Sequence, residues 1–231
     1  MPTAAKTAPN RNAIHPFDKR YGTDTGGYLS PEELVTGQAN DGLNHGYSAV
    51  APSVFREAMR RWRGTLPAVG GRIEGYGFVD VGAGKGRVLF LASELPFRKI
   101  VGVELHPPLA RIAEKNIDRW RRVTRTGSNI RMLQQDVLKF RWPRPPLLVY
   151  LYNPFHCSLV AQLTESLASL PASSASLVDL LYVNPTCTDV ITASGGFSHL
   201  WTVRIEMNEA DQKADPYGTS NDLVSAFRRT R

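Results

Sequence analysis

The sequence predicts an α/β protein whose parallel sheet is covered by helices on both faces. Three observations lead to this prediction. A glycine-rich turn joins an apolar strand to an apolar helix, strands and helices then alternate, and most of the strands are continuously apolar. We expect a doubly wound sheet of seven mostly parallel strands with one antiparallel edge strand, and a ligand at the carboxyl ends of the strands.

Composition and charge limit the classes of protein. The chain has 231 residues, 42% of them apolar and 21% charged, which allows a large globular core. Its net charge of +7 permits an acidic or nucleic-acid partner, but the basic residues are spread over several segments, so nucleic acid is possible and not favoured. No apolar run reaches the ~20 residues of a membrane span, and the first residues do not resemble a signal peptide.

The two cysteines, Cys157 and Cys187, form no C-x-x-C pair. We therefore expect no metal site, and a reduced, cytoplasmic protein.

The chain divides into three segments. Residues 1–16 are expected to be a disordered arm, residues 17–51 a loop-rich extension, and residues 52–231 the main domain. The extension is rich in Gly, Asp, Asn, Thr and Tyr, a composition that is uncommon for such a length inside a compact domain. Two interpretations remain open: a lid over ligand and substrate, or a surface extension packed by its own tyrosines.

The main domain opens with a helix from about residue 52, and its sheet begins near Gly77. The glycine turn has the spacing D-x-G-x-G-x-G, from Asp80 to Gly86. A phosphate-binding Walker loop is excluded, because Val79 replaces its first glycine and Gly86 its Ser or Thr. The dinucleotide fingerprint is excluded as well, because Arg87 stands where its third glycine would be.

The later strands also end in polar residues. Strands are expected near 99–104, 130–133, 147–151 and 176–183, with helices between them, and two more alternating strands at 199–206 and 223–229. The residues that close the first four are Glu104, Asp136, Asn153 and Asn184. The carboxyl ends of parallel strands meet at one edge, so these side chains are expected to converge there.

The segment Asp80-Val81-Gly82-Ala83-Gly84-Lys85-Gly86-Arg87, together with Glu104 and Asp136, resembles the class I S-adenosylmethionine-dependent methyltransferases over residues 52–231. The resemblance implies a Rossmann-like fold and S-adenosylmethionine as cofactor. It implies cofactor contacts in three groups: Asp80, Gly82, Ala83, Gly84 and Gly86 along the amino-acid part, Glu104 with Leu105 at the ribose, and Asp136 with Val137 at the adenine. Alternatively, Glu104 is a surface acid and Asp136 a helix N-cap.

The turn Tyr152-Asn153-Pro154-Phe155 is similar to the N-P-P-Y/F motif of amino-methylating enzymes. That similarity implies that all four residues are catalytic, and that Asn153, also near the cofactor, holds an acceptor amine. Only one proline is present, and the alternative is a simple turn. A weaker resemblance links the chain to protein-lysine methyltransferases without a SET domain, with tyrosines either lining a channel or packing in the core: Tyr21, Tyr28, Tyr47 and Tyr152.

The expected activity is methyl transfer to nitrogen, or less readily to oxygen, on a protein or small molecule. Two alternatives stay open: a non-catalytic nucleic-acid-binding protein on the same fold, and a small-molecule O-methyltransferase. His156 and Cys157 follow the Asn-Pro-Phe turn, where they are either a base and a nucleophile or packing residues.

Overall fold

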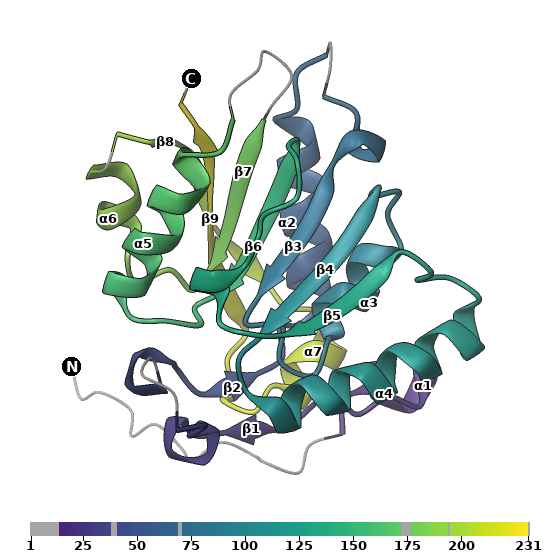
Figure 1. The fold of residues 1–231 in the computed structure, drawn as a ribbon. Coiled ribbons are helices and arrows are strands. Elements are labelled where there is room, and N and C mark those ends of the chain that lie inside the picture. The colour runs from purple at the N-terminus through teal and green to yellow at the C-terminus, as the bar shows by residue number, and fades with distance from the viewer. Residues whose placement is uncertain (1–13, 38–40, 69–70, 172–176, 194, 231) are drawn as a thin grey trace, which may run out of the picture.

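A computed structural model describes residues 14–37, 41–68, 71–171, 177–193 and 195–230. A seven-stranded sheet in the order β5-β4-β3-β6-β7-β9-β8 forms its centre (Figure 1). The strands are β3 (Gly77–Val81), β4 (Lys99–Glu104), β5 (Ile130–Gln134), β6 (Leu147–Tyr152), β7 (Val178–Val183), β8 (Phe197–Glu206) and β9 (Asn221–Arg229).

The strands β3 to β7 pair in parallel. The last strand, β9, runs antiparallel to β7 on one side and to β8 on the other. The predicted doubly wound, mostly parallel sheet is therefore confirmed, with the reversed strand lying one position in from the edge. This placement brings the start of β9 to the edge of the sheet at which β6 and β7 end.

Helices cover both faces because alternate strand residues point to opposite sides. One face carries α2 (Pro52–Gly64), α3 (Arg87–Ser93) and α4 (Pro107–Thr124), whose apolar residues pack on Phe78, Tyr150 and their neighbours. The other face carries α5 (Cys157–Ala168) and α6 (Thr188–Ala193), which pack on Val79, Leu151 and the apolar residues around them. Both sides of the parallel strands are buried, as their continuous apolar sequence predicts.

The N-terminal extension lies across the edge of the sheet at which the parallel strands end, seen as the purple segment at the bottom of Figure 1. It contains a short helix, a two-stranded hairpin and two single turns: α1 (Pro16–Tyr21), β1 (Tyr28–Leu29), η1 (Pro31–Leu34), η2 (Asp41–Leu43) and β2 (Tyr47–Ser48). Most of the disordered arm expected for residues 1–16 lies outside the described residues, and Pro16 begins α1. The other short elements of the chain are η3 (Ile73–Gly75), η4 (Val137–Lys139) and α7 (Glu209–Ala214).

A buried charge pair fixes the extension to the main domain. Arg87 Nη2 lies 3.2 Å from Asp18 Oδ2, and both side chains are about 5% exposed. The other Asp18 oxygen accepts hydrogen bonds from the backbone and hydroxyl of Thr25, and Arg87 Nε donates to the same hydroxyl at 2.7 Å. Phe17 stacks on Trp120 of α4, with ring centroids 5.8 Å apart. The extension is thus part of the folded core.

The structure joins Cys157 and Cys187 in a disulfide, so the expectation of reduced thiols is wrong. Cys157 begins α5 after β6, and Cys187 follows β7, which pairs with β6. The sheet therefore brings together two cysteines 30 residues apart, with their Cα atoms at 5.2 Å. A nucleophilic role for Cys157 is excluded in this state, because its sulfur is not a free thiol.

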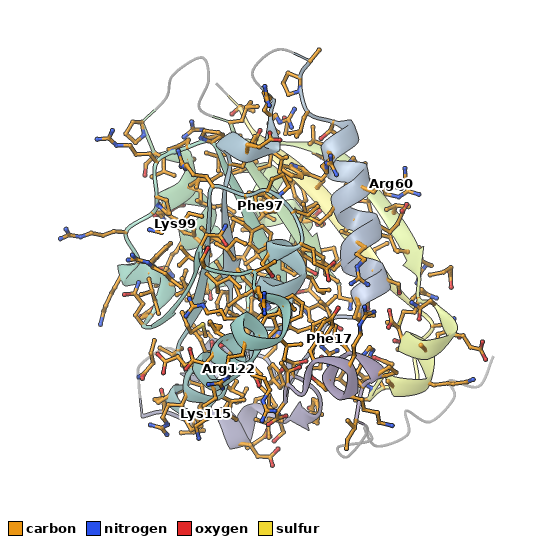
Figure 2. The ribbon with its side chains drawn as sticks, turned by 90° about the vertical axis from the view of Figure 1, so that its right-hand side faces the viewer. Phe17, Arg60, Phe97, Lys99, Lys115 and Arg122 are labelled. Carbon is orange, nitrogen blue, oxygen red and sulfur yellow. A yellow bond between two sulfur atoms is a disulfide. The ribbon has the colours of Figure 1, made fainter. Side chains whose placement is uncertain are left out.

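Two surface properties complete the fold. Figure 2 shows basic side chains on separate elements: Arg60 on α2, Lys99 on β4, and Lys115 and Arg122 on α4. Among the described helices, none has the length and apolar character needed to cross a membrane.

Candidate functional site

A pocket opens where β3, β4, β5 and β6 end, beneath the N-terminal extension. It encloses about 760 Å³ of empty space, open solvent at its mouth included. Its floor comes from the strand ends and the start of α4, and its roof from Leu34, Thr36 and residues 44–48 of the extension. Eight predicted site residues line it: Gly82, Glu104, Leu105, Asp136, Val137, Tyr152, Pro154 and Phe155.

Glu104 ends β4 and lies in the pocket wall with 8% of its surface exposed. Its Oε2 accepts the backbone N–H of Gly84 and its Oε1 that of His106, each at 2.8 Å. Burial raises the pKa of this carboxyl, although the backbone N–H groups of His106, Gly84 and Leu105 lower it. These N–H groups hold the carboxylate in one orientation in the pocket wall, where it can accept hydrogen bonds from a ligand.

Asp136 follows β5 and is both a pocket residue and a helix N-cap. Its Oδ1 accepts the N–H of Leu138 at 2.9 Å and so caps η4. Asp136 is therefore both the N-cap of η4 and a residue of the pocket lining. Val137 is buried beside it in the wall. On the opposite wall His106 Nδ1 is buried and has no hydrogen-bond partner among the described residues.

The glycine turn makes room chiefly for the protein's own side chains. A Cβ at Gly82 would come within 2.8 Å of Pro154 Cβ, and one at Gly84 would collide with the ring of Tyr47. Gly86 caps α3 with φ 92°, where a Cβ would face Ala113 of α4. Only Gly82 of these three lines the pocket. Ala83, Gly84 and Gly86 lie outside its lining and position the loop around it.

Asp80 lies behind the pocket lining in β3, where it pairs with Tyr150 of β6. It is 3% exposed, and burial, with the charge of Glu104, raises its pKa well above the ordinary value. An unneutralised carboxyl in such a place favours a cationic ligand group, because a positive charge would lower the cost of ionising it.

The side chain of Asn153 lies outside the pocket lining, although its sequence motif predicted a role in holding the acceptor amine. The residue has φ 38°, and its Oδ1 accepts hydrogen bonds from the hydroxyls of Tyr182 and Thr186, each at 3.0 Å. Its backbone oxygen is 2.8 Å from His45 Nδ1, which must carry the proton because a carbonyl only accepts. The side chain does not line the pocket, whereas its neighbours Tyr152, Pro154 and Phe155 do.

The extension is bound to this turn and to the glycine loop. His45 N donates to the oxygen of Pro154 at 2.9 Å, and His156 N to that of Leu43 at the same distance. The ring of His156 packs 4.9 Å from that of His45. Lys85 Nζ donates to Asp24 and to the oxygen of Gly26, so the lysine of the glycine loop holds the extension.

The four tyrosines considered as channel walls separate into two groups. Tyr21 packs on Trp120, with ring centroids 4.5 Å apart, and belongs to the core. Tyr47 covers Gly84 and donates its hydroxyl to the oxygen of Thr25. Tyr47 also lines the pocket, as does Tyr152, whereas Tyr28 makes an edge-to-face contact with Tyr217 outside the pocket lining.

Asp222 was not expected at the site and lies at the start of β9, next to the ends of β6 and β7. It is 3% exposed, and Asn184 Nδ2 donates to its Oδ1 at 2.7 Å. Burial raises the pKa of Asp222 to about 6, with Asn184 lowering it and the charge of Asp215 raising it. The only sequence signal was the polar pair Asn221-Asp222 before an apolar strand, which is ordinary for a strand start.

Comparisons with known proteins agree with the fold. No protein-family model matches the sequence, and no curated protein matches it. Among solved structures, a putative RNA methyltransferase, PH1948, from Pyrococcus horikoshii is similar with a TM-score of 0.51 and 15% identity, over 77% of this chain and 82% of that one. Magnesium protoporphyrin IX methyltransferase from Synechocystis PCC 6803, with bound S-adenosylmethionine, gives 0.51 and 15%, over 77% of each chain. The chain therefore has the Rossmann-like fold of class I methyltransferases.

Proposed function

We propose that this protein is an S-adenosylmethionine-dependent methyltransferase. The observation that carries the proposal is the oriented carboxylate of Glu104 in a pocket at the carboxyl edge of this fold. A carboxylate has two acceptor oxygens, which match the two hydroxyls of a ribose, and Asp136 lies in the same pocket for an exocyclic amine. When bound, the cofactor supplies an activated methyl group, and the protein supplies binding, orientation and exclusion of water.

The cofactor's amino-acid part would lie toward Asp80 and Gly82. Asp80 provides a buried carboxyl for its ammonium group, whose positive charge would favour ionisation of that carboxyl. Gly82 gives backbone without a side chain at the pocket wall. The roof formed by Leu34, Thr36 and residues 44–48 would exclude water from the methyl group, because His45 of this roof already contacts the Pro154 turn.

We propose nitrogen as the methylated atom, on a small molecule or a protein side chain. The polar side chains on β6, on its neighbour β3 and at the start of β9 include carboxylates and phenols: Asp80, Asp222 and Tyr150 are buried, and Tyr152 is half-buried. Such groups accept hydrogen bonds from N–H and favour a positively charged acceptor. Oxygen acceptors of low pKa are disfavoured, because their anions would be repelled by the same carboxylates.

Calorimetric titration with S-adenosylmethionine and its demethylated product tests the cofactor assignment. Both ligands are expected to bind the wild type, and Glu104→Gln should weaken them about tenfold to a hundredfold, since hydrogen bonds to charged groups contribute about 1.5–3 kcal/mol. Glu165→Gln, an exposed glutamate on α5, is the matched control and should bind normally.

Two results would contradict the proposal. One is a wild-type protein that binds neither ligand but binds NAD or ATP. The other is a folded Glu104→Gln variant with wild-type affinity for both. Because Glu104 also accepts two backbone N–H groups, the unfolding curve of the variant must be measured alongside.

A further inference from the structure

The disulfide between Cys157 and Cys187 adjoins the wall of the pocket, and the proposed function leaves it unused. Cys157 begins α5 two residues after Phe155, and both Phe155 and Leu159 line the pocket. Cys187 follows β7 and immediately precedes α6. The bond therefore joins the start of α5 to the connection between β7 and α6, beside the turn of residues 153–156.

A hydrogen bond forms a second link across this turn. Thr186, next to Cys187 in the chain, donates its hydroxyl to Oδ1 of Asn153 at 3.0 Å. Asn153 has φ 38°, a left-handed conformation that is unfavourable for a residue with a side chain and persists only where the surroundings hold it. The turn thus belongs to a closed ring of residues, completed on one side by the S–S bond and on the other by this hydrogen bond.

The roof of the pocket is bound to the same turn. The contacts that join residues 43–45 of the extension to residues 153–156 are His45 Nδ1 with the oxygen of Asn153 (2.8 Å), His45 N with that of Pro154 (2.9 Å), His156 N with that of Leu43 (2.9 Å), and a bridge between Asn44 and Phe155. Asn44 and His45 line the pocket, so a shift of the turn also moves the pocket wall.

The two sulfur atoms differ in exposure. Cys157 is half-buried, whereas Cys187 is 2% exposed, so an attacking thiolate reaches Cys157 and Cys187 is the leaving group. The hydroxyl of Thr186 lies 3.4 Å from Cys187 Sγ and has a single proton, which can stabilise the leaving thiolate only by leaving Asn153. Two reduced sulfur atoms cannot stay at bonding distance, so reduction also separates the start of α5 from residues 186–187.

We propose that the Cys157–Cys187 disulfide is a reversible redox switch that sets how tightly the pocket binds its ligand. In the oxidised protein the turn of residues 153–156 is held on both sides, and the roof is bound to it. In the reduced protein both links weaken, the contacts between roof and turn loosen, and the ligand binds less tightly. This inference rests on the proposed function for its ligand, the demethylated cofactor.

The redox step needs a dithiol reductant. One thiolate of the dithiol attacks Cys157 Sγ, the S–S bond breaks, and its electron pair leaves on Cys187 Sγ, which takes up a proton. The second thiolate of the dithiol attacks its own sulfur in the mixed disulfide, and Cys157 leaves as a thiolate that solvent protonates. The protein thereby gains two electrons and two protons, and the dithiol becomes a cyclic disulfide. A small disulfide oxidant reverses both steps.

Binding of the demethylated cofactor to the two redox forms tests the switch. Reduction of the wild type with dithiothreitol is expected to weaken binding about threefold to tenfold, the range that loss of one neutral hydrogen bond produces. Reoxidation with oxidised glutathione should restore the affinity. The double variant Cys157→Ser/Cys187→Ser has no thiol, because these are the only cysteines of the chain. It should bind like the reduced protein and should not respond to dithiothreitol.

A second variant tests the hydrogen bond through which the switch acts. Thr186→Val keeps the disulfide and removes the hydroxyl, so its oxidised form should bind the demethylated cofactor less tightly than the oxidised wild type. Thr192→Val is the matched control, because its hydroxyl donates within its own helix α6, and it should bind normally. Equal affinity of the two oxidised variants would exclude the Thr186–Asn153 link from the switch and overturn this mechanism.

Amide hydrogen exchange follows the switch without the cofactor. The N–H groups of His45 and His156 are hydrogen-bonded in the oxidised protein and should exchange faster after reduction, whereas that of Val101 in the middle of β4 should not change. Unchanged exchange or unchanged affinity after reduction would overturn the switch. Unfolding of the reduced protein would overturn it as well, because the disulfide would then only hold the fold together. If neither redox form binds the demethylated cofactor, the proposed function fails, and hydrogen exchange still decides the switch.

Discussion

Two regions of the molecule differ in how their buried polar groups are paired. Around the glycine turn, here called the cofactor half after the proposed function, Arg87 is paired with Asp18, and Glu104 accepts backbone N–H groups. Toward β9, in the region of Asp222 and Tyr150 that is here called the acceptor half, each of these two residues keeps a buried polar atom with no partner among the described residues. Paired groups stabilise a fold, and unpaired ones destabilise it until a ligand arrives. Removing a charge is therefore expected to have opposite effects on stability in the two halves.

The largest effect is expected in the cofactor half. Arg87→Met leaves the Asp18 carboxylate buried without its partner, which should lower the free energy of unfolding by about 3–5 kcal/mol. Urea denaturation followed by circular dichroism measures this change. The double variant Arg87→Met/Asp18→Asn should recover part of the loss, because no buried charge remains. If the free energy of unfolding of Arg87→Met falls by less than about 1 kcal/mol, the buried Arg87–Asp18 pair does not stabilise the fold as expected.

The acceptor half should respond in the other direction. Asp222→Asn removes an acid whose pKa is raised by burial from 3.8 to about 6. Below about pH 4 the carboxyl is protonated in both the folded and unfolded states, so it costs nothing. Between about pH 4 and pH 6 the Asp222 carboxyl ionises in the unfolded state but stays protonated in the folded state. The free energy of unfolding therefore falls by about 3 kcal/mol over this range and stays lower at higher pH.

Thermal and urea unfolding at several pH values check this prediction. The Asn variant should exceed the wild type by about 3 kcal/mol at about pH 8 and equal it below about pH 4. Asp189→Asn serves as the control, because this acid belongs to a surface helix. A variant that is less stable than the wild type at high pH would mean that Asp222 is a structural carboxylate.

The smallest expected change in stability concerns the hydroxyl of Tyr150. Tyr150→Phe removes a buried hydroxyl without a partner, and it should raise the free energy of unfolding by about 1 kcal/mol because an unsatisfied group is no longer desolvated. Tyr182→Phe is the comparison, since the Tyr182 hydroxyl donates to Asn153 and its removal should lower stability. Equal signs for the two variants would contradict the idea that Tyr150 lacks a partner.

The cofactor half could largely be predicted from the sequence, because its parts are local. The glycine turn, Glu104 and Asp136 each follow directly from the strand that positions them, and parallel strands converge at one edge. The seven-stranded fold is confirmed for the same reason. What the turn could not reveal is that Gly84 makes room for Tyr47, which comes from a separate segment of the chain.

The acceptor half could not be predicted, because it depends on a strand that turns back. Asp222 contacts Asn184 only because β9 pairs antiparallel with β7. No local sequence pattern predicts this position and direction of the strand. The disulfide between Cys157 and Cys187 could not be predicted for a similar reason, since the two cysteines lie close together only because β6 pairs with β7. The sequence Asn-Pro-Phe does not determine where the Asn153 carboxamide points. In the structure it accepts hydrogen bonds from Tyr182 and Thr186 and does not line the pocket.

The reversed strand β9 has a consequence for tolerance to mutation. Its first residues stand at one end of the C-terminal hairpin with β8, and β9 pairs with β7 and β8 and with none of β3, β4 and β5. Substitutions at that end of the hairpin are therefore expected to leave the glycine turn and the strands around it in register.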